Sequence, residues 1–116
     1  MEEPKESQYE VIITDPAEIS FYELIDYLYD HYSLDKAEKI ANEIRDSAKT
    51  LKYYARRGAL EPRLRHRKEN YRFILYNRTK RAEVKIIYFI LEQEGKVFVT
   101  DFFPTEKEDR GIKKRN

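Results

Sequence analysis

The stretch Val84-Lys-Ile-Ile-Tyr-Phe-Ile-Leu91 is rich in β-branched and aromatic residues, which predicts a β-strand. Two stretches of the same character flank it, Tyr71-Arg-Phe-Ile-Leu-Tyr76 before it and Val97-Phe-Val-Thr-Asp-Phe-Phe103 after it. Only short polar segments, residues 77–81 and 92–95, separate the three stretches. Because connections this short join neighbouring strands, we expect an antiparallel meander.

The first half of the chain has a different pattern, a strand followed by two helices. Residues 9–14 predict a strand that Asp15-Pro16 ends, and Asp15 is expected to cap a first helix that runs to about Tyr32. Helical spacing of apolar residues resumes after Ser33-Leu-Asp35 and predicts a second helix that ends near Gly58. The predicted order is β-αα-βββ, an α+β fold in which a helix hairpin packs on one face of a small, mainly antiparallel sheet.

The length of 116 residues predicts a single domain over residues 9–110, with a flexible tail over residues 1–8 and a basic tail over residues 111–116. With no Cys, two His and three Gly, the chain offers no disulfide, no thiolate metal site and no glycine-rich nucleotide loop. We therefore expect neither a metal nor a cofactor. No apolar run is long enough to span a bilayer and no secretory signal is present, so we expect no membrane partner and a cytoplasmic location.

The net charge of +1 conceals a strong asymmetry between the two halves of the chain. Residues 1–50 contain 5 Lys and Arg against 13 Asp and Glu, a balance of −8, whereas residues 51–116 contain 18 against 9, a balance of +9. Such asymmetry indicates an anionic partner for the basic half, and nucleic acid is the most obvious one.

The basic half contains a set of candidate RNA-binding side chains. Guanidinium groups hold phosphates while aromatic rings stack on unpaired bases, and Arg72 lies between Tyr71 and Phe73. His66 is the candidate general base for a ribose hydroxyl. The alternatives are that the cations only solvate the surface and that His66 is a loop residue with no role. The other candidate cations are Arg63, Arg65, Arg67, Lys68, Arg78, Lys80 and Arg81.

The order of elements resembles the RelE/ParE superfamily of type II toxin-antitoxin toxins over residues 9 to about 110. The resemblance rests on the first strand followed by Asp15-Pro16-Ala17, on the helix hairpin, and on Tyr71-Arg-Phe-Ile-Leu75 as the first basic strand. Lys85-Ile-Ile-Tyr88 is similar to the family's Tyr-Arg-hydrophobic-hydrophobic-Tyr strand, and Val97–Phe103 matches the closing strand.

The resemblance implies a metal-independent endoribonuclease that cleaves mRNA on the ribosome through the ribose 2′-hydroxyl. Arg72 and Lys85 would then neutralise the pentacoordinate phosphorane, and Lys107 or Arg110 would stabilise the leaving oxygen, with His66 as the base. Arg110 would also contact RNA. This chain has Lys85 where the family usually has Arg, and it lacks the carboxy-terminal Tyr found in some relatives.

The resemblance also leaves two other functions open. Some members of the superfamily poison DNA gyrase without being nucleases, and others are non-catalytic interaction domains. In each toxin the expected partner is a cognate antitoxin protein whose segment wraps the domain, and Tyr27, Tyr53 and Tyr54 are the candidate contacts here.

Overall fold

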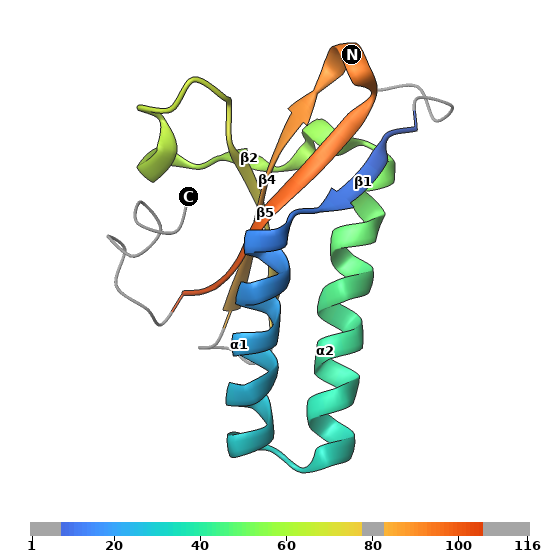
Figure 1. Cartoon of the computed structure of the whole chain (residues 1–116), viewed down its shortest axis with the longest axis vertical. Helices are drawn as coiled ribbons and strands as arrows, with labels where there is room; N and C mark the ends of the chain where they lie inside the picture. Colours follow the sequence, from blue (N-terminus) through green and yellow to red (C-terminus); the bar gives the residue numbers. More distant parts are fainter. Residues whose placement is uncertain (1–7, 78–82, 106–116) are drawn as a thin grey trace.

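The computed structural model describes residues 8–77 and 83–105. These residues form two long helices, five strands and four short 3-10 turns. Figure 1 shows the two helices running side by side, with the connection between them at the end of the molecule farthest from the β4–β5 turn. The elements are β1 Glu10–Ile13, α1 Asp15–His31, α2 Leu34–Lys49, η1 Thr50–Lys52, η2 Ala55–Arg57, β2 Ala59–Leu60, η3 Pro62–Leu64, β3 Arg72–Asn77, β4 Glu83–Leu91, η4 Glu92–Glu94 and β5 Lys96–Pro104.

The five strands form one sheet in the order β1-β5-β4-β3-β2. The meander predicted for β3, β4 and β5 is confirmed, since both β3–β4 and β4–β5 pair antiparallel. β1 pairs parallel to β5, and the two-residue strand β2, which was not predicted, adds to β3. The α+β fold with a helix hairpin on one face of a mainly antiparallel sheet is therefore confirmed.

The ends of both helices differ from the sequence prediction. Thr14, not Asp15, caps α1, because its hydroxyl accepts a hydrogen bond from the Ala17 N–H at 3.3 Å while donating to the Val99 carbonyl at 2.9 Å. α2 ends at Lys49 rather than near Gly58. The chain beyond α2 turns through η1 and η2.

One side chain stabilises this early end of the second helix. Arg57 donates to the Tyr53 carbonyl at 2.8 Å, to the Thr50 carbonyl at 3.3 Å and to the Thr50 hydroxyl at 2.6 Å. These contacts satisfy carbonyls that a longer helix would have paired internally. Tyr54, between η1 and η2, adopts a left-handed φ of 51°, which an α-helix excludes.

The helices cover one face of the sheet, called here the helix face. Its alternate residues Val84, Ile86 and Tyr88 on β4 are fully buried in the main core cluster with α1 and α2. Phe21 of α1 packs on Phe102 of β5 with ring centroids 5.2 Å apart. No helix among residues 8–77 and 83–105 is long and apolar enough to cross a membrane.

The opposite side of the sheet, called here the second face, carries Phe73, Lys85, Ile87, Phe89, Phe98 and Phe103. It is partly covered by the segment between β2 and β3, whose Leu64 and Tyr71 form a smaller cluster with Ile87 and Phe103. Thr100 has no partner in the β4–β5 register and forms a bulge. The three residues after the bulge, Asp101, Phe102 and Phe103, are all buried, because the sheet is covered on both faces at this point.

Candidate nucleic-acid interface

The segment Pro62–Lys68, called here the basic loop, brings several of the predicted cations together. Arg63-Leu-Arg-His-Arg-Lys68 contains four cations and no carboxylate. Leu64 is fully buried in the cluster on the second face, so the loop is anchored through this apolar side chain. Arg65 and Lys68 are exposed, and Arg63 and Arg67 are half-buried.

Glu61 holds the start of the basic loop. Its side chain is fully buried, and one carboxylate oxygen accepts from the Arg63 backbone N–H at 2.9 Å, which caps η3. The other oxygen accepts from Lys85 Nζ at 2.6 Å. The Glu61 backbone N–H donates to the Tyr71 carbonyl at 2.8 Å, which ties the two ends of the loop together. The position of the cations is therefore set by a buried carboxylate.

Lys85 lies on the second face beneath the loop and is paired locally. Its side chain is only 15% exposed, and its ammonium lies 4.3 Å from the centroid of the Phe73 ring in addition to the contact with Glu61. Removing one member of a buried ion pair typically costs about 3–5 kcal/mol, so Lys85 is not free to follow a phosphate. In this geometry its charge stabilises the fold of the loop.

Arg72 lies on the other side of the sheet from Lys85. In the β3–β4 register Arg72 is opposite Tyr88 on the helix face, whereas Lys85 is opposite Leu75 on the second face. The guanidinium of Arg72 donates to the Gly58 carbonyl at 2.8 Å and to the Arg56 carbonyl at 3.3 Å. The structure therefore does not bring Arg72 and Lys85 together on one face of the sheet, and their joint action on one phosphate stays a prediction.

The turn that Arg72 holds is closely packed. The Tyr88 hydroxyl donates to the Ala55 carbonyl at 2.5 Å and accepts from the Gly58 N–H at 3.1 Å. A side chain at Gly58 would meet this hydroxyl, so only Gly fits there. Arg72 thus completes a structural network between β3, β4 and η2.

His66 is exposed in the basic loop, beside an open hollow of about 490 Å³ that Pro62, Arg63, Arg65 and His66 line. Arg67 Nε donates to His66 Nε2 at 3.2 Å. Because the arginine Nε always carries its proton, His66 Nε2 is the acceptor in this contact. Action of His66 as a base therefore requires Arg67 to move away first.

Several neighbouring charges have structural partners. Arg56 forms an exposed ion pair with Glu92, which also accepts a hydrogen bond from the Tyr9 hydroxyl at 3.0 Å.

The negative charge of the helix layer is concentrated on α1, which has five carboxylates and no Lys or Arg, while α2 has four of each sign. Outside the described residues lie Arg78, Lys80, Arg81, Lys107 and Arg110, the predicted tail over residues 111–116, and all but the last residue of the predicted tail over residues 1–8.

Glu61 was missed in the sequence analysis, although one local signal could have found it. An acidic residue directly before Pro62 matches the pattern of a cap at the start of a helical turn. Its pairing with Lys85 joins residues 24 positions apart, which no local pattern indicates.

In the described part of the chain, no group of three or more His, Asp or Glu is placed to hold a metal ion.

Tyr71 closes the basic loop and supplies a pH-dependent prediction. Burial raises the pKa of its phenol above the usual 10.0, the charge of Glu69 raises it further, and Arg67 opposes the shift. The folded state therefore holds this proton more tightly than the unfolded state. The stabilisation that the protonated Tyr71 phenol contributes is complete below the unfolded pKa of 10.0, and it is lost as the pH rises through the higher pKa of the folded state.

We expect Tyr71→Phe to lose less unfolding free energy than the wild type as the pH rises from about 9 to about 11, measured by urea unfolding. Tyr22→Phe, which changes an exposed tyrosine on α1, is the control and should follow the wild type. Equal alkaline losses in the wild type and Tyr71→Phe would contradict the assignment.

Comparisons of the chain with protein-family models, with curated proteins and with solved structures found no match. The fold and the site together define a small α+β domain whose sheet carries an anchored cationic loop on the face opposite its helices.

Proposed function

We propose that this protein is a toxin of the RelE/ParE type that binds mRNA through the basic loop and thereby inhibits translation. The observation that carries the proposal is the loop itself, in which four cations without an intervening carboxylate are held on a buried anchor. Preorganised cations contact phosphates without first losing the conformational entropy of a free loop. The element order supports the toxin class through the resemblance stated above.

The proposed chemistry at the loop is binding of phosphates along a single strand. Arg65 and Lys68 are exposed and directly available, and Arg63 and Arg67 in the same loop are half-buried. The acidic helix α1 packs on the helix face, so its repulsion of RNA acts away from this loop. We propose Lys107 and Arg110 as further contacts in the same role.

A second candidate function, the non-catalytic RelE-like interaction domain, is favoured by a specific observation. Lys85 is committed to Glu61, Arg72 to backbone carbonyls, and His66 Nε2 to Arg67. In this arrangement none of the three is poised for phosphoryl transfer. Experiment must therefore separate a toxin that cleaves RNA, a toxin that binds RNA without cleavage, and a non-toxic interaction domain.

Production of the protein without an antitoxin is expected to arrest growth and translation. Arg65→Ala combined with Lys68→Ala should relieve both effects, because these exposed side chains contact phosphate without supporting the fold. Primer extension on cellular mRNA after induction is the measurement. Codon-phased cuts identify an endoribonuclease, and translation arrest without cuts identifies the binding form.

Two outcomes of the same induction would contradict the proposal. Double-strand DNA breaks with translation initially intact would identify the gyrase poison. Unimpaired growth at high protein levels would reject a toxin and favour the non-catalytic interaction domain. As partner we propose an antitoxin with an acidic segment that covers the basic loop. Its proposed apolar contacts are Tyr27 on α1 and Tyr53 after η1, which are both exposed, together with Tyr54.

A further inference from the structure

A row of three aromatic rings crosses the second face of the sheet. It starts at Tyr71, three residues after the end of the basic loop, continues with Phe89 on β4 and ends at Phe98 on β5. The ring centroids of Tyr71 and Phe89 are 5.4 Å apart with an interplanar angle of 69°, and those of Phe89 and Phe98 are 5.3 Å apart at 23°. The last two rings are thus stacked and nearly parallel.

The far end of this row is accessible. Tyr71 is buried, whereas Phe89 and Phe98 are half-buried. Among the described residues, Phe98 belongs to neither of the two core clusters, and the same holds for Ile12, its neighbour in the β1–β5 register. Phe89 and Phe98 therefore keep part of their surface open to solvent on the second face, where a planar group can contact them.

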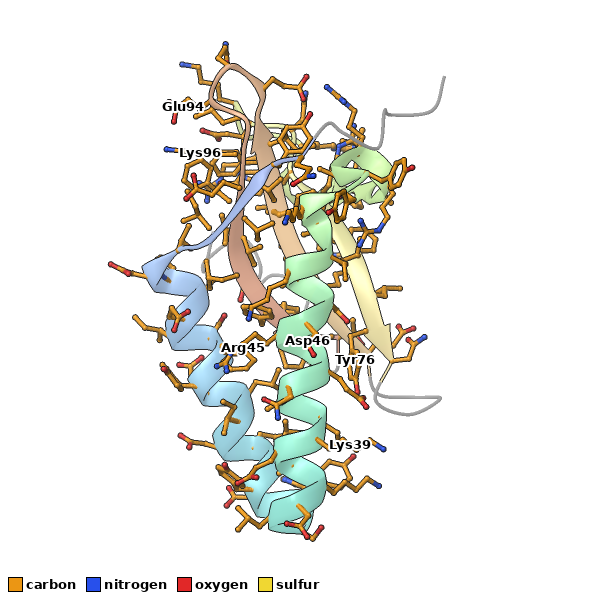
Figure 2. The ribbon with its side chains drawn as sticks, turned by 90° about the vertical axis from the view of Figure 1, so that its right-hand side faces the viewer. Lys39, Arg45, Asp46, Tyr76, Glu94 and Lys96 are labelled. Carbon is orange, nitrogen blue, oxygen red and sulfur yellow. The ribbon has the colours of Figure 1, made fainter. Side chains whose placement is uncertain are left out.

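Charge is distributed unequally along the row. Four cations of the basic loop lie at the Tyr71 end. At the other end, Lys96 Nζ lies 3.5 Å from Glu94 Oε1, and Glu10 is opposite Lys96 in the register. Figure 2 shows Glu94 and Lys96 near the turn between β4 and β5. Positive charge is thus balanced near Phe98 and in excess at the loop.

We propose that Phe89 and Phe98 form a base-stacking platform for single-stranded RNA whose phosphates are held by the basic loop. The inference rests on the proposed function and names the form of RNA that the site takes. Rings suit bases because every base has a flat π-face, whereas paired bases inside a duplex are not available for stacking. The balanced charge at Phe98 suits a base rather than a phosphate, and the excess charge at the loop suits the backbone.

Phe98→Leu tests the platform, because leucine keeps an apolar side chain but removes the ring. Affinity for a fluorescein-labelled RNA of about ten nucleotides is measured by anisotropy at low salt. We expect binding roughly tenfold weaker for Phe98→Leu and restored in Phe98→Tyr. Equal affinity of Phe98→Leu and wild type would overturn the platform while leaving the loop, and so the proposed function, intact.

The chain contains no Trp, so a single introduced Trp reports on its own position. The tryptophan fluorescence of the Phe98→Trp variant should be quenched by the single-stranded RNA and should not change with a duplex of the same sequence. Tyr22→Trp, at an exposed position on α1, is the matched control and should not respond. Quenching of both reporters to the same extent, or of neither while RNA binds, overturns the platform.

Two further outcomes are decisive. Absence of RNA binding by the wild-type protein, with both Trp variants silent, overturns the proposed function and the platform together. A shift in the emission of the Phe98→Trp variant that depends on protein concentration and not on RNA shows instead that a second copy of the chain covers this face, and it also overturns the platform.

Discussion

Glu61→Ala is expected to lower the free energy of unfolding by about 3 kcal/mol and to release the basic loop. The substitution leaves the Lys85 ammonium, which is only 15% exposed, without its carboxylate, and it removes the cap on the Arg63 N–H. Urea unfolding measures the stability. Limited trypsin digestion measures the release, since Arg63, Arg65 and Arg67 become cleavable when the loop opens locally.

Two comparisons isolate the cause of this effect. Glu69→Ala removes an exposed carboxylate from the same segment and should change stability by less than about 0.5 kcal/mol. Glu61→Leu combined with Lys85→Met should recover part of the loss in stability, because it removes both buried charges. If Glu61→Ala and Glu69→Ala prove equally stable, Glu61 does not anchor the loop.

Arg65→Ala combined with Lys68→Ala is expected to weaken binding of single-stranded RNA by roughly tenfold to thirtyfold at low salt. Both side chains are exposed, so their loss removes phosphate contacts and leaves the buried anchor unchanged. Each lost contact also reduces the dependence of affinity on salt. The slope of the logarithm of the association constant against the logarithm of salt concentration is negative, and it should become shallower by about 1.4 when both positions are changed.

The matched control removes the same net charge from the helix layer. Lys39→Ala combined with Lys49→Ala changes two exposed lysines of α2. Both lysines belong to α2, which packs on the helix face, whereas the basic loop is anchored on the second face. Binding and salt slope should then remain close to those of the wild type. An equal loss in the control would show that only net charge matters and that the loop is not the binding site.

Much of the fold could be predicted because its signals are local. Alternating β-branched and aromatic residues define β3, β4 and β5, and helical spacing of apolar residues defines α1 and α2. The errors fall where a distant contact decides the local structure. Thr14 caps α1 while its hydroxyl also bonds Val99, and Arg57 returns to Thr50 at the end of the second helix.

The candidate site could be predicted only in part. A run of cations close together in sequence remains close together in space, so Arg63, Arg65, Arg67 and Lys68 share one loop. Which cations are committed to structural partners depends on the register and on the fold of the segment after α2. Sequence alone therefore could not show that Arg72 bonds carbonyls on the helix face or that Lys85 pairs with Glu61.

The amino-acid sequence by itself determined the order of the elements, the charge asymmetry and the position of the basic loop, because periodicity and composition act over a few residues. Only the tertiary structure decided which face each side chain occupies and which charges are paired. Strand register assigns Arg72 and Lys85 to opposite faces, and the buried carboxylate of Glu61 pairs with Lys85. Both outcomes depend on contacts between distant residues, whose geometry no local pattern specifies.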